Sequence, residues 1–478
     1  MRAYPMIIQG GMGVGISDWR LARAVSSHGQ LGVVSGTALD ELLARRLQMG
    51  DPGGHMRRAL DHFPVARLAE DVWHSFYIAG GKAPTAPFVT RTQPSSAPAA
   101  DWQALTVVAN FVEVFLAREG HDNPVGINYL EKIQTPHLPA IYGAMLAGVH
   151  YVLMGAGIPL RIPGVLDLFV NHEPATYPLT VTGAGADDVT MLSFDPKAVV
   201  GLTTPPLVRP QFLAIIASDV LALTLQRRAN GRVDGFIVEG PTAGGHNAPP
   251  RGALQLSDRG EPVYGSRDVV NLDKLKALGL PFWLAGGSGA PGRLREALDR
   301  GAEGIQVGTA FAMCAESGLR EDFKRTLLHQ VRDGATDIFT DSRASPTGFP
   351  FKVARISGTL SDASLLEARP RICDLGYLRE AYRGADGATA FRCPAEPVNV
   401  FVSKGGTPDA AVGRVCICNA LVATAGLAQV RAGKWVEPGI VTMGDDLPGV
   451  ARFLPQGATG YGAADVIATL ELECRSAG

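Results

Sequence analysis

Cysteine is scarce in this chain, and long apolar runs and a large net charge are missing. Only six cysteines occur among 478 residues, and none precedes Cys314, so a secreted disulfide framework is not expected. No run of about 18 apolar residues is present, which argues against a transmembrane helix. Forty-four basic and 46 acidic residues leave a formal net charge of −2, so neither a nucleic acid nor a membrane is predicted as a partner.

The first residues also lack the features of a targeting signal. Met1-Arg2-Ala3-Tyr4-Pro5 leads directly into an apolar segment, without the charged region and apolar core of a signal peptide. Together with the scarcity of cysteine, this predicts a cytoplasmic protein. The sequence leaves the oligomeric state open, and a homodimer is one of the assemblies that it allows.

Glycine and proline, by contrast, are plentiful. The 57 glycines and 33 prolines are spread along the chain, which indicates tight connections and backbone-built sites rather than disorder. Hydrophobic residues make up 46% of the chain, enough for a large core. A barrel of alternating strands and helices uses about 250 residues, so the length allows one barrel with large additions.

Eight short apolar runs, each ending in glycine or a polar residue, recur through the first two thirds of the chain. Such uninterrupted runs are typical of parallel strands buried on both faces. Helical patterns lie between several of them, for example over residues 18–28, where Ser17 is expected to cap the helix. These features predict a (β/α)8 TIM barrel, with a doubly wound open sheet as the alternative. The runs span residues 6–9, 31–35, 124–128, 150–154, 212–216, 235–239, 282–285 and 304–308.

Two stretches interrupt the repeat, and a third follows it. Residues 52–105 form a large insertion whose Pro-rich and Ser-rich end is typical of a loose linker. Residues 177–200 resemble a hairpin between the fourth and fifth strands. The repeat stops at about residue 325. We therefore predict a barrel over residues 1–325 and a cysteine-containing extension over residues 326–478 that covers it.

Glycines follow the first predicted strand at Gly10-Gly11-Met12-Gly13-Val14-Gly15. Their spacing does not satisfy the dinucleotide fingerprint at any starting position. Without side chains, they let the backbone approach a flat ligand at the end of the strand. An ordinary tight turn is the alternative.

A more specific pair of glycine sites ends the seventh and eighth strands, at Ala285-Gly286-Gly287 and at Gly308-Thr309. In βα barrels these two loops commonly bind a phosphate, because backbone N–H groups and a helix N-terminus point at the anion. Glycine is needed there because a Cβ atom would hold the phosphate away. Tight barrel turns without a ligand are the alternative.

The histidine of Ala243-Gly244-Gly245-His246 follows the sixth strand and is therefore expected at the barrel mouth, where catalytic groups lie. An imidazole titrates near neutrality and can take a proton from carbon. A loop histidine is more often structural, but the position of His246 favours a catalytic role.

Taken together, these motifs resemble the nitronate monooxygenase family, formerly called 2-nitropropane dioxygenases, which includes flavin-dependent enoyl-ACP reductases. The resemblance covers about residues 4–320. The segments that carry it are 8–12 in the first strand, 125–128 in the third strand, 243–246 around the histidine, and 285–287 with 304–311 and 316–317 in the phosphate region.

The resemblance implies FMN bound without covalent attachment. It also implies that His246 is the base in the oxidation of a small carbon acid, an alkyl nitronate, to a carbonyl compound and nitrite. The cofactor-binding residues that it implies are Gln9, Gly10, Gly11, Met12, Asn128, Gly244, Gly245, Gly286, Gly287, Gly308 and Thr309.

The sequence departs from the family on the substrate side. Pro241-Thr242 precede the histidine motif and residues 247–252 follow it with an unfamiliar sequence. Two alternatives therefore stay open. One is an NAD(P)H-dependent reductase of enoyl thioesters or quinones, with an acyl-thioester substrate, and the other is a non-catalytic flavin-binding or metal-binding sensor.

Four of the cysteines gather late in the sequence, at Cys373, Cys393, Cys416 and Cys418. Four thiolates suit an iron–sulfur cluster or a structural zinc ion. Their spacing matches no standard ligand signature, however, so reduced and partly buried thiols are the alternative.

Overall fold

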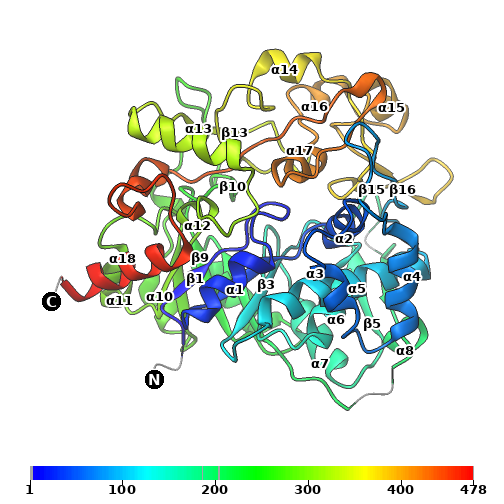
Figure 1. The fold of residues 1–478 in the computed structure, drawn as a ribbon, viewed down its shortest axis with the longest axis horizontal. Helices are drawn as coiled ribbons and strands as arrows, with labels where there is room; N and C mark the ends of the chain where they lie inside the picture. The colour runs from blue at the N-terminus through cyan, green and yellow to red at the C-terminus, as the bar shows by residue number, and fades with distance from the viewer. Residues whose placement is uncertain (1–3, 186, 203–204, 477–478) are drawn as a thin grey trace.

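A closed parallel barrel forms the centre of the computed structural model, which describes residues 4–185, 187–202 and 205–476 (Figure 1). Every barrel strand pairs in parallel with its neighbours, and the bridge between Ile8 and Leu31 closes the ring between the first and second strands. The predicted TIM barrel is therefore confirmed, and an open sheet is excluded. In chain order the barrel strands are β1 (Ile7–Gln9), β2 (Gly32–Ser35), β3 (Val125–Leu130), β4 (Tyr151–Gly155), β8 (Gln211–Ile216), β9 (Gly235–Glu239), β11 (Phe282–Ala285) and β12 (Gly304–Val307).

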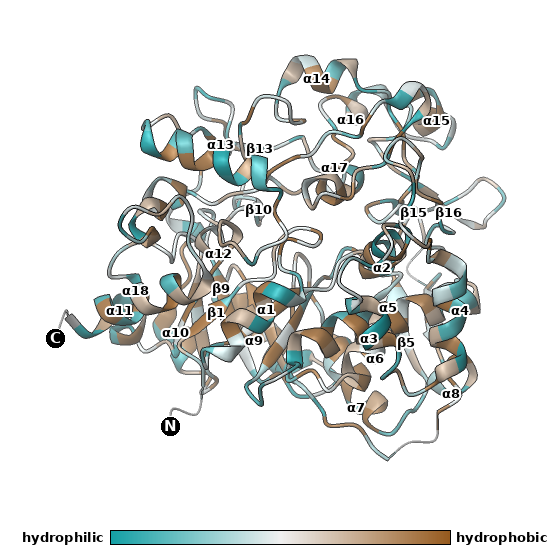
Figure 2. Ribbon diagram, in the orientation of Figure 1, coloured by the Kyte–Doolittle hydropathy of each residue, from teal (hydrophilic) through white to brown (hydrophobic). Residues whose placement is uncertain are grey.

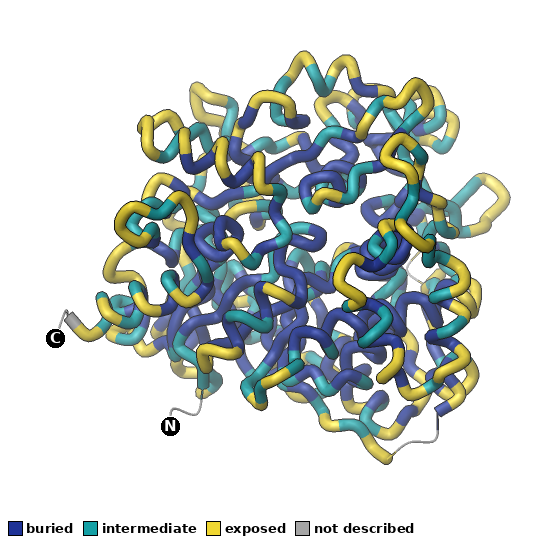
Figure 3. Tube along the Cα trace, in the orientation of Figure 1, coloured by how far each residue is buried: buried dark blue, intermediate teal, exposed yellow. Residues whose placement is uncertain are grey.

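Buried apolar side chains lie on both faces of these strands. Ile8, Leu153 and Trp283 belong to a small cluster inside the barrel, whereas alternating neighbours such as Ile7 and Val152 belong to the larger cluster between strands and helices. This double burial explains why the strands read as uninterrupted apolar runs. In the hydropathy and burial views, hydrophobic residues (brown) and buried residues (dark blue) are concentrated around the barrel (Figures 2 and 3).

Helices surround the barrel, as the repeat predicted. One detail differs, because Asp18 rather than Ser17 caps the first helix by accepting hydrogen bonds from the N–H groups of Arg20 and Leu21. The Ser17 hydroxyl instead donates to the carbonyl of Gly10. The helices between the strands are α1 (Trp19–Ser27), α2 (Leu39–Gln48), α5 (Ala100–Arg118), α6 (His137–Leu146), α7 (Ile162–Val170), α9 (Asp219–Arg228), α10 (Leu272–Lys276), α11 (Arg293–Asp299) and α12 (Thr309–Ala312), with a 3-10 turn at Ser266–Asp268.

One of these helices, α5, is long and apolar enough to cross a membrane by length and composition alone. In the structure 83% of its apolar window is buried, and the helix packs against α1, α2 and α6. It is therefore a core helix of the barrel layer, in keeping with the expectation from the sequence.

The insertion is ordered, so the predicted loose linker is wrong. It begins with α3 (His55–Leu60) and α4 (Ala66–Phe76) and continues as an irregular strap over residues 77–99. Along this strap, the backbone N–H of Phe88 donates to Gln429, and the Gln93 amide donates to the carbonyl of Cys373. The strap thus lies against the extension and is hydrogen-bonded to it.

The predicted hairpin is confirmed by β5 (Ala175–Leu179) and β7 (Thr190–Phe194), which pair in antiparallel fashion before α8 (Pro196–Val199). Between them, β6 (Val181–Thr182) pairs with β15 (Glu380–Arg383) of the extension. The hairpin therefore anchors part of the extension.

The extension covers the C-terminal end of the barrel (Figure 1). Its predicted start at residue 326 falls inside α13 (Glu321–Arg332). Two of its strands, β13 (Ile338–Asp341) and β14 (Phe351–Ala354), form a sheet with β10 (Gly245–His246) at the barrel mouth. Its other elements are β16 (Thr389–Arg392), α14 (Ala363–Ala368), α15 (Val398–Ser403), α16 (Pro408–Ala411), α17 (Ile417–Thr424), α18 (Ala463–Ser476) and 3-10 turns at Ala432–Lys434 and Leu447–Phe453.

Barrel and extension share one core. Side chains of the extension, such as those of Phe351 and Leu447, lie in the same hydrophobic cluster as Ile7 and Phe212 of the barrel strands. The extension is thus a packed cover over the barrel rather than a separate domain.

Candidate active site

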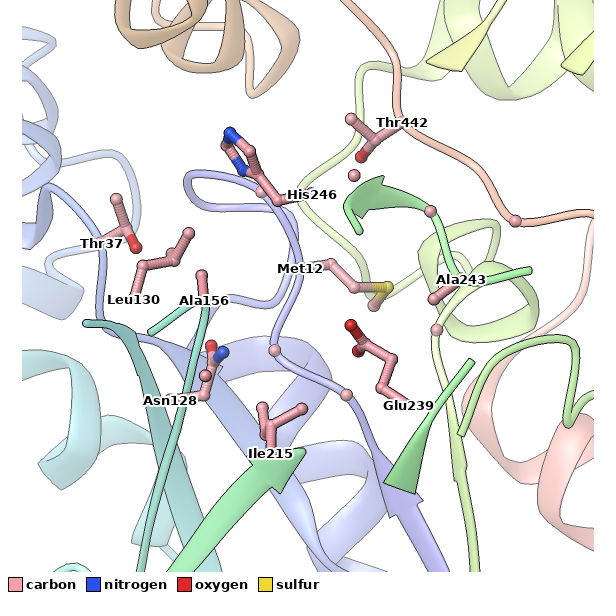
Figure 4. A pocket seen from close by; sticks show the side chains of 18 of the residues that line it. Met12, Thr37, Asn128, Leu130, Ala156, Ile215, Glu239, Ala243, His246 and Thr442 are labelled. Atoms are coloured by element: carbon pink, nitrogen blue, oxygen red, sulfur yellow. The ribbon is translucent and has the colours of Figure 1, made fainter. Parts of the chain in front are cut away.

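A cavity of about 200 Å³ lies between the C-terminal ends of the strands and the extension. In Figure 4, Asn128, Ile215 and Glu239 lie at its lower end, and His246 and Thr442 lie at its upper end. Eleven of the twelve residues predicted for the site line this cavity. They are Gly10, Gly11, Met12, Asn128, Gly244, Gly245, His246, Gly286, Gly287, Gly308 and Thr309.

Gln9 is the exception. Its side chain is fully buried behind the cavity wall, where its amide nitrogen donates to Ser17 and its amide oxygen accepts from the backbone N–H of Val33. Gln9 therefore braces the first two strands and does not contact the cavity.

Glycine is required at two points of the cavity wall. A Cβ atom at Gly11 would lie 1.9 Å from Oδ1 of Asn128. At Gly286 the backbone has a φ of +88°, and a Cβ atom would lie 3.0 Å from the carbonyl oxygen of Gly240. Both positions thus combine close approach with a backbone that a side chain would disturb.

Two buried oxygen atoms at the cavity have no hydrogen-bond partner among the described residues. They are Oε1 of Gln306, on β12, and Oδ1 of Asp446, in the extension. A buried acceptor without a donor costs free energy unless a ligand supplies one. The oxygen of Gln306 therefore fits a ligand that supplies an N–H donor, such as a flavin ring, whereas Asp446 would have to be protonated to pair with a phosphate.

Asp446 lies at the loops predicted to hold a phosphate. Its Oδ2 accepts a hydrogen bond from the backbone N–H of Gly289 at 3.2 Å, and the neighbouring Gly444 N–H donates to the Thr309 hydroxyl at 2.9 Å. Burial raises the pKa of Asp446. A protonated Asp446 could donate to a phosphate, whereas an ionised one would repel it.

His246 contacts the extension on two sides. Its Nε2 lies 2.6 Å from Oγ of Ser345, and its ring makes an edge contact with Phe351, with 4.8 Å between the ring centroids. Burial, followed by the charge of Lys132, lowers the pKa of His246 to about 4. The imidazole is therefore neutral at pH 7, so one of its two ring nitrogens is unprotonated.

Glu239 is a second titratable group in this cavity. It ends β9, points into the cavity (Figure 4), and also borders a neighbouring cavity of about 200 Å³ that Arg251 and Tyr264 line. Burial raises the pKa of Glu239 to about 7. A carboxyl group with this pKa can give or take a proton near neutral pH.

Sequence reasoning missed four residues of the site, for two reasons. Glu239 ends a predicted barrel strand and Gln306 lies near the end of another, so their position at the catalytic end was available from the pattern. Ser345 and Asp446 belong to the extension. No local sequence pattern shows which residues of the extension reach the cavity.

The four late cysteines also come together. Cys373, Cys393 and Cys416 pack in one small buried cluster, and Cys418 lines the cavity. Among the residues that the structure describes, however, no group of three or more His, Cys, Asp or Glu side chains is placed to hold a metal ion. The predicted iron–sulfur or zinc site at these four cysteines is therefore not supported among the described residues.

Comparison with known proteins agrees with this geometry. Residues 211–343 match the profile of the family described as nitronate monooxygenase. This segment is similar to the nitronate monooxygenase family. It contains His246 and the two phosphate loops, and it ends shortly after α13, so most of the extension lies outside the match.

Curated relatives match over similarly short stretches. A nitronate monooxygenase of Pseudomonas aeruginosa is 37% identical over 118 residues, which are 24% of this chain and 32% of that protein. One from Paraburkholderia phytofirmans is 34% identical over 192 residues, which are 38% of this chain and 46% of that protein. The chain thus spans between about a third and a half of the length of these relatives.

Solved structures align along most of the chain at low identity. A nitroalkane oxidase from Streptomyces ansochromogenes aligns over 99% of this chain and 98% of its own, with 16% identity and a TM-score of 0.48. FabK from Thermotoga maritima aligns over 99% and 93%, with 16% identity and a TM-score of 0.46. The assignment of the barrel fold rests on the pairing of its strands and not on these alignments.

Proposed function

We propose that this protein is an FMN-dependent oxidoreductase that acts on a small carbon acid. One observation carries the proposal: a single cavity combines the glycine loops after β11 and β12 with the neutral imidazole of His246. The family match over residues 211–343 supports the same conclusion.

Several residues would hold the cofactor. Gly287, Gly308 and Thr309 offer backbone N–H groups to its phosphate, while Gln306 and Asn128 offer polar atoms to the edge of its ring system. When bound, FMN would supply the electron acceptor, which no side chain of the cavity can provide. The chain itself contributes binding, orientation and proton transfer.

His246 would take the proton from the α-carbon of a nitroalkane, and this step gives the nitronate. The neutral imidazole is ready to accept it, and the hydrogen bond to Ser345 fixes the orientation of the ring. In the proposed reaction, the C–N bond of the alkyl nitronate breaks, nitrite leaves with both of its oxygen atoms, and dioxygen, the oxidant, supplies the oxygen atom of the carbonyl compound. Glu239, with its pKa near 7, would exchange protons on the opposite side of the cavity.

The test is an anaerobic reduction experiment on purified protein loaded with FMN. Alkyl nitronates are expected to bleach the flavin absorbance, with the product and nitrite measured after air is admitted. Rapid bleaching by NADH or NADPH, without reaction of nitronates, would instead establish the enoyl-thioester or quinone reductase. Bound flavin that none of these compounds reduces would point to a sensor and contradict the proposal.

A further inference from the structure

Lys132 is an exposed cation at the rim of the cavity. It follows β3 in a turn and stands between Leu130 and Ile133, two residues that line the cavity. Among the described residues, no carboxylate forms an ion pair with its ammonium group. The carboxylate of the adjacent Glu131 instead accepts hydrogen bonds from the side chains of Gln134 and Tyr177. The charge of Lys132 is therefore not neutralised by the protein.

The ring of Phe349 connects Lys132 with His246. Nζ of Lys132 lies 4.8 Å from the centroid of this ring, which is a cation–π contact. The imidazole of His246 lies edge-on to the same ring, with 6.5 Å between the centroids and 82° between the planes. Because Phe349 belongs to the extension and precedes β14, barrel and extension together hold the ammonium group near His246. Burial, followed by the charge of Lys132, lowers the pKa of that histidine.

The other charged groups near His246 do not cancel this positive charge. The Arg414 guanidinium donates to the carbonyl group of Ser345, the residue whose hydroxyl contacts the histidine, and it forms no ion pair within the part of the chain that the structure describes. Two carboxyl groups line the cavity, those of Glu239 and Asp446. Burial raises the pKa of both and so disfavours their charged forms. An anion that enters beside His246 would therefore meet positive charge.

We propose that Lys132 is a specificity-determining residue that attracts the negative charge of the substrate at the entrance of the cavity. It would draw alkyl nitronates in from solution and would also retain the nitronate that His246 forms from a neutral nitroalkane. This inference rests on the proposed function, since it names the charge of the substrate at the same site. Attraction of this kind raises the local concentration of an anion and weakens as salt is added.

The test is steady-state turnover of the FMN-loaded protein with ethyl nitronate and with nitroethane, at low and at high ionic strength. Lys132→Met keeps an apolar chain against Phe349 but removes the charge. It should raise KM for ethyl nitronate roughly tenfold at low salt, a value between the limits for a protein surface and for bulk water. The kcat for the nitronate should stay nearly unchanged, and so should KM for the neutral nitroethane.

Two further variants separate charge from packing. Lys132→Arg keeps both the charge and the stacking on Phe349, so it should restore the wild-type KM. Lys197→Met is the matched control, because Lys197 is an exposed lysine of α8 that does not line the cavity. It should behave as the wild type does.

A second readout needs neither flavin nor turnover. Propionate resembles ethyl nitronate in shape and charge, and propionamide is its neutral counterpart. In NMR spectra of protein with isotope-labelled histidine, the signal of His246 should respond to propionate at lower concentration in the wild type than in Lys132→Met. Propionamide should affect both proteins equally. In the same spectra the pKa of His246 should be higher in Lys132→Met, because a nearby positive charge has been removed.

The contrary results are specific to this inference. Equal KM values for the nitronate in the wild type and in Lys132→Met, with equal affinities for propionate, would overturn it and leave the proposed function intact. A fall in kcat for the nitronate without a rise in KM would also overturn it. If neither substrate reduced the flavin, the proposed function would fail, and the propionate titration would still decide the role of Lys132. Should Lys132→Met fail to fold, a KM of the wild type for ethyl nitronate that does not change with salt would overturn the inference.

Discussion

At the scale of single residues, His246 is distinguished by being neutral and held in place. Because its pKa lies at about 4, the ring is unprotonated across the physiological range, and Ser345 and Phe351 fix its orientation. Replacing His246 by Ala should lower kcat by about 100-fold or more, the usual contribution of a general base, while FMN stays bound.

The measurement is steady-state turnover with the flavin content determined in parallel. His329→Ala, on the exposed face of α13, is the control and should turn over normally. Wild-type kcat should fall as the pH drops towards 4, where His246 becomes protonated. Undiminished turnover by the His246 variant would remove this residue from the mechanism.

We expect the affinity for FMN to depend on the protonation of the Asp446 carboxyl group. Burial raises its pKa, and a bound phosphate would favour the protonated form further, so FMN binding should take up a proton. The affinity for FMN is therefore expected to fall as pH rises. Asp446→Asn should bind FMN roughly tenfold more tightly at pH 8, which corresponds to about one unit of pKa interaction.

Fluorescence titration of FMN at several pH values checks this expectation. The exposed carboxylate of Asp299 provides the control, since Asp299→Asn should reproduce the wild-type curve. An affinity that is independent of pH in the wild type, or weaker binding by Asp446→Asn, would show that Asp446 does not face the phosphate.

Glu239 makes stability depend on pH. Its folded-state pKa of about 7 lies above the unfolded value, so its contribution to stability is complete below the unfolded pKa and is lost as pH rises through 7. Glu239→Gln should therefore be more stable than the wild type by roughly 3 kcal/mol at pH 8.5 and by less than about 1 kcal/mol at pH 5. Denaturant unfolding at the two pH values measures the difference, and an equal difference at both would contradict it.

At the scale of elements, the eight barrel strands could be predicted because each is buried on both faces and so reads as an apolar run. The strap over residues 77–99 could not. Its prolines and serines are typical of a linker, yet Arg91 of the strap lies buried between Asp40 and Glu41 of α2. The strap is held in place by residues that are far away in the sequence. A local sequence pattern contains no information about such contacts.

This buried ion pair gives a test of the strap. Arg91→Leu leaves the buried carboxylate of Asp40 without a cation, whereas Glu41 keeps its ion pair with Arg45. Breaking a buried ion pair should lower the free energy of unfolding by about 3–5 kcal/mol. Arg67→Leu breaks the exposed pair with Asp71 and should cost less than about 1 kcal/mol. Chemical denaturation of both variants compares the two costs, and a similar small loss for Arg91→Leu would mean that the strap is not anchored there.

At the scale of the whole molecule, the extension completes the active site rather than merely covering it. It supplies Ser345 beside the histidine, Asp446 beside the phosphate loops and Cys418 in the cavity wall. The sequence identified the barrel half of the site, because glycines and a histidine at strand ends have a fixed place in this fold. The other half depends on docking between segments that are more than 50 residues apart.

The central claim is that the loops after β11 and β12 hold the phosphate of a flavin. The most direct measurement compares the affinities of the protein for FMN and for riboflavin, which lacks the phosphate. The account predicts that FMN binds far more tightly, and that Gly286→Val, which places a side chain where φ is +88°, removes this preference. Equal affinities for FMN and riboflavin, or no flavin binding at all, would contradict it.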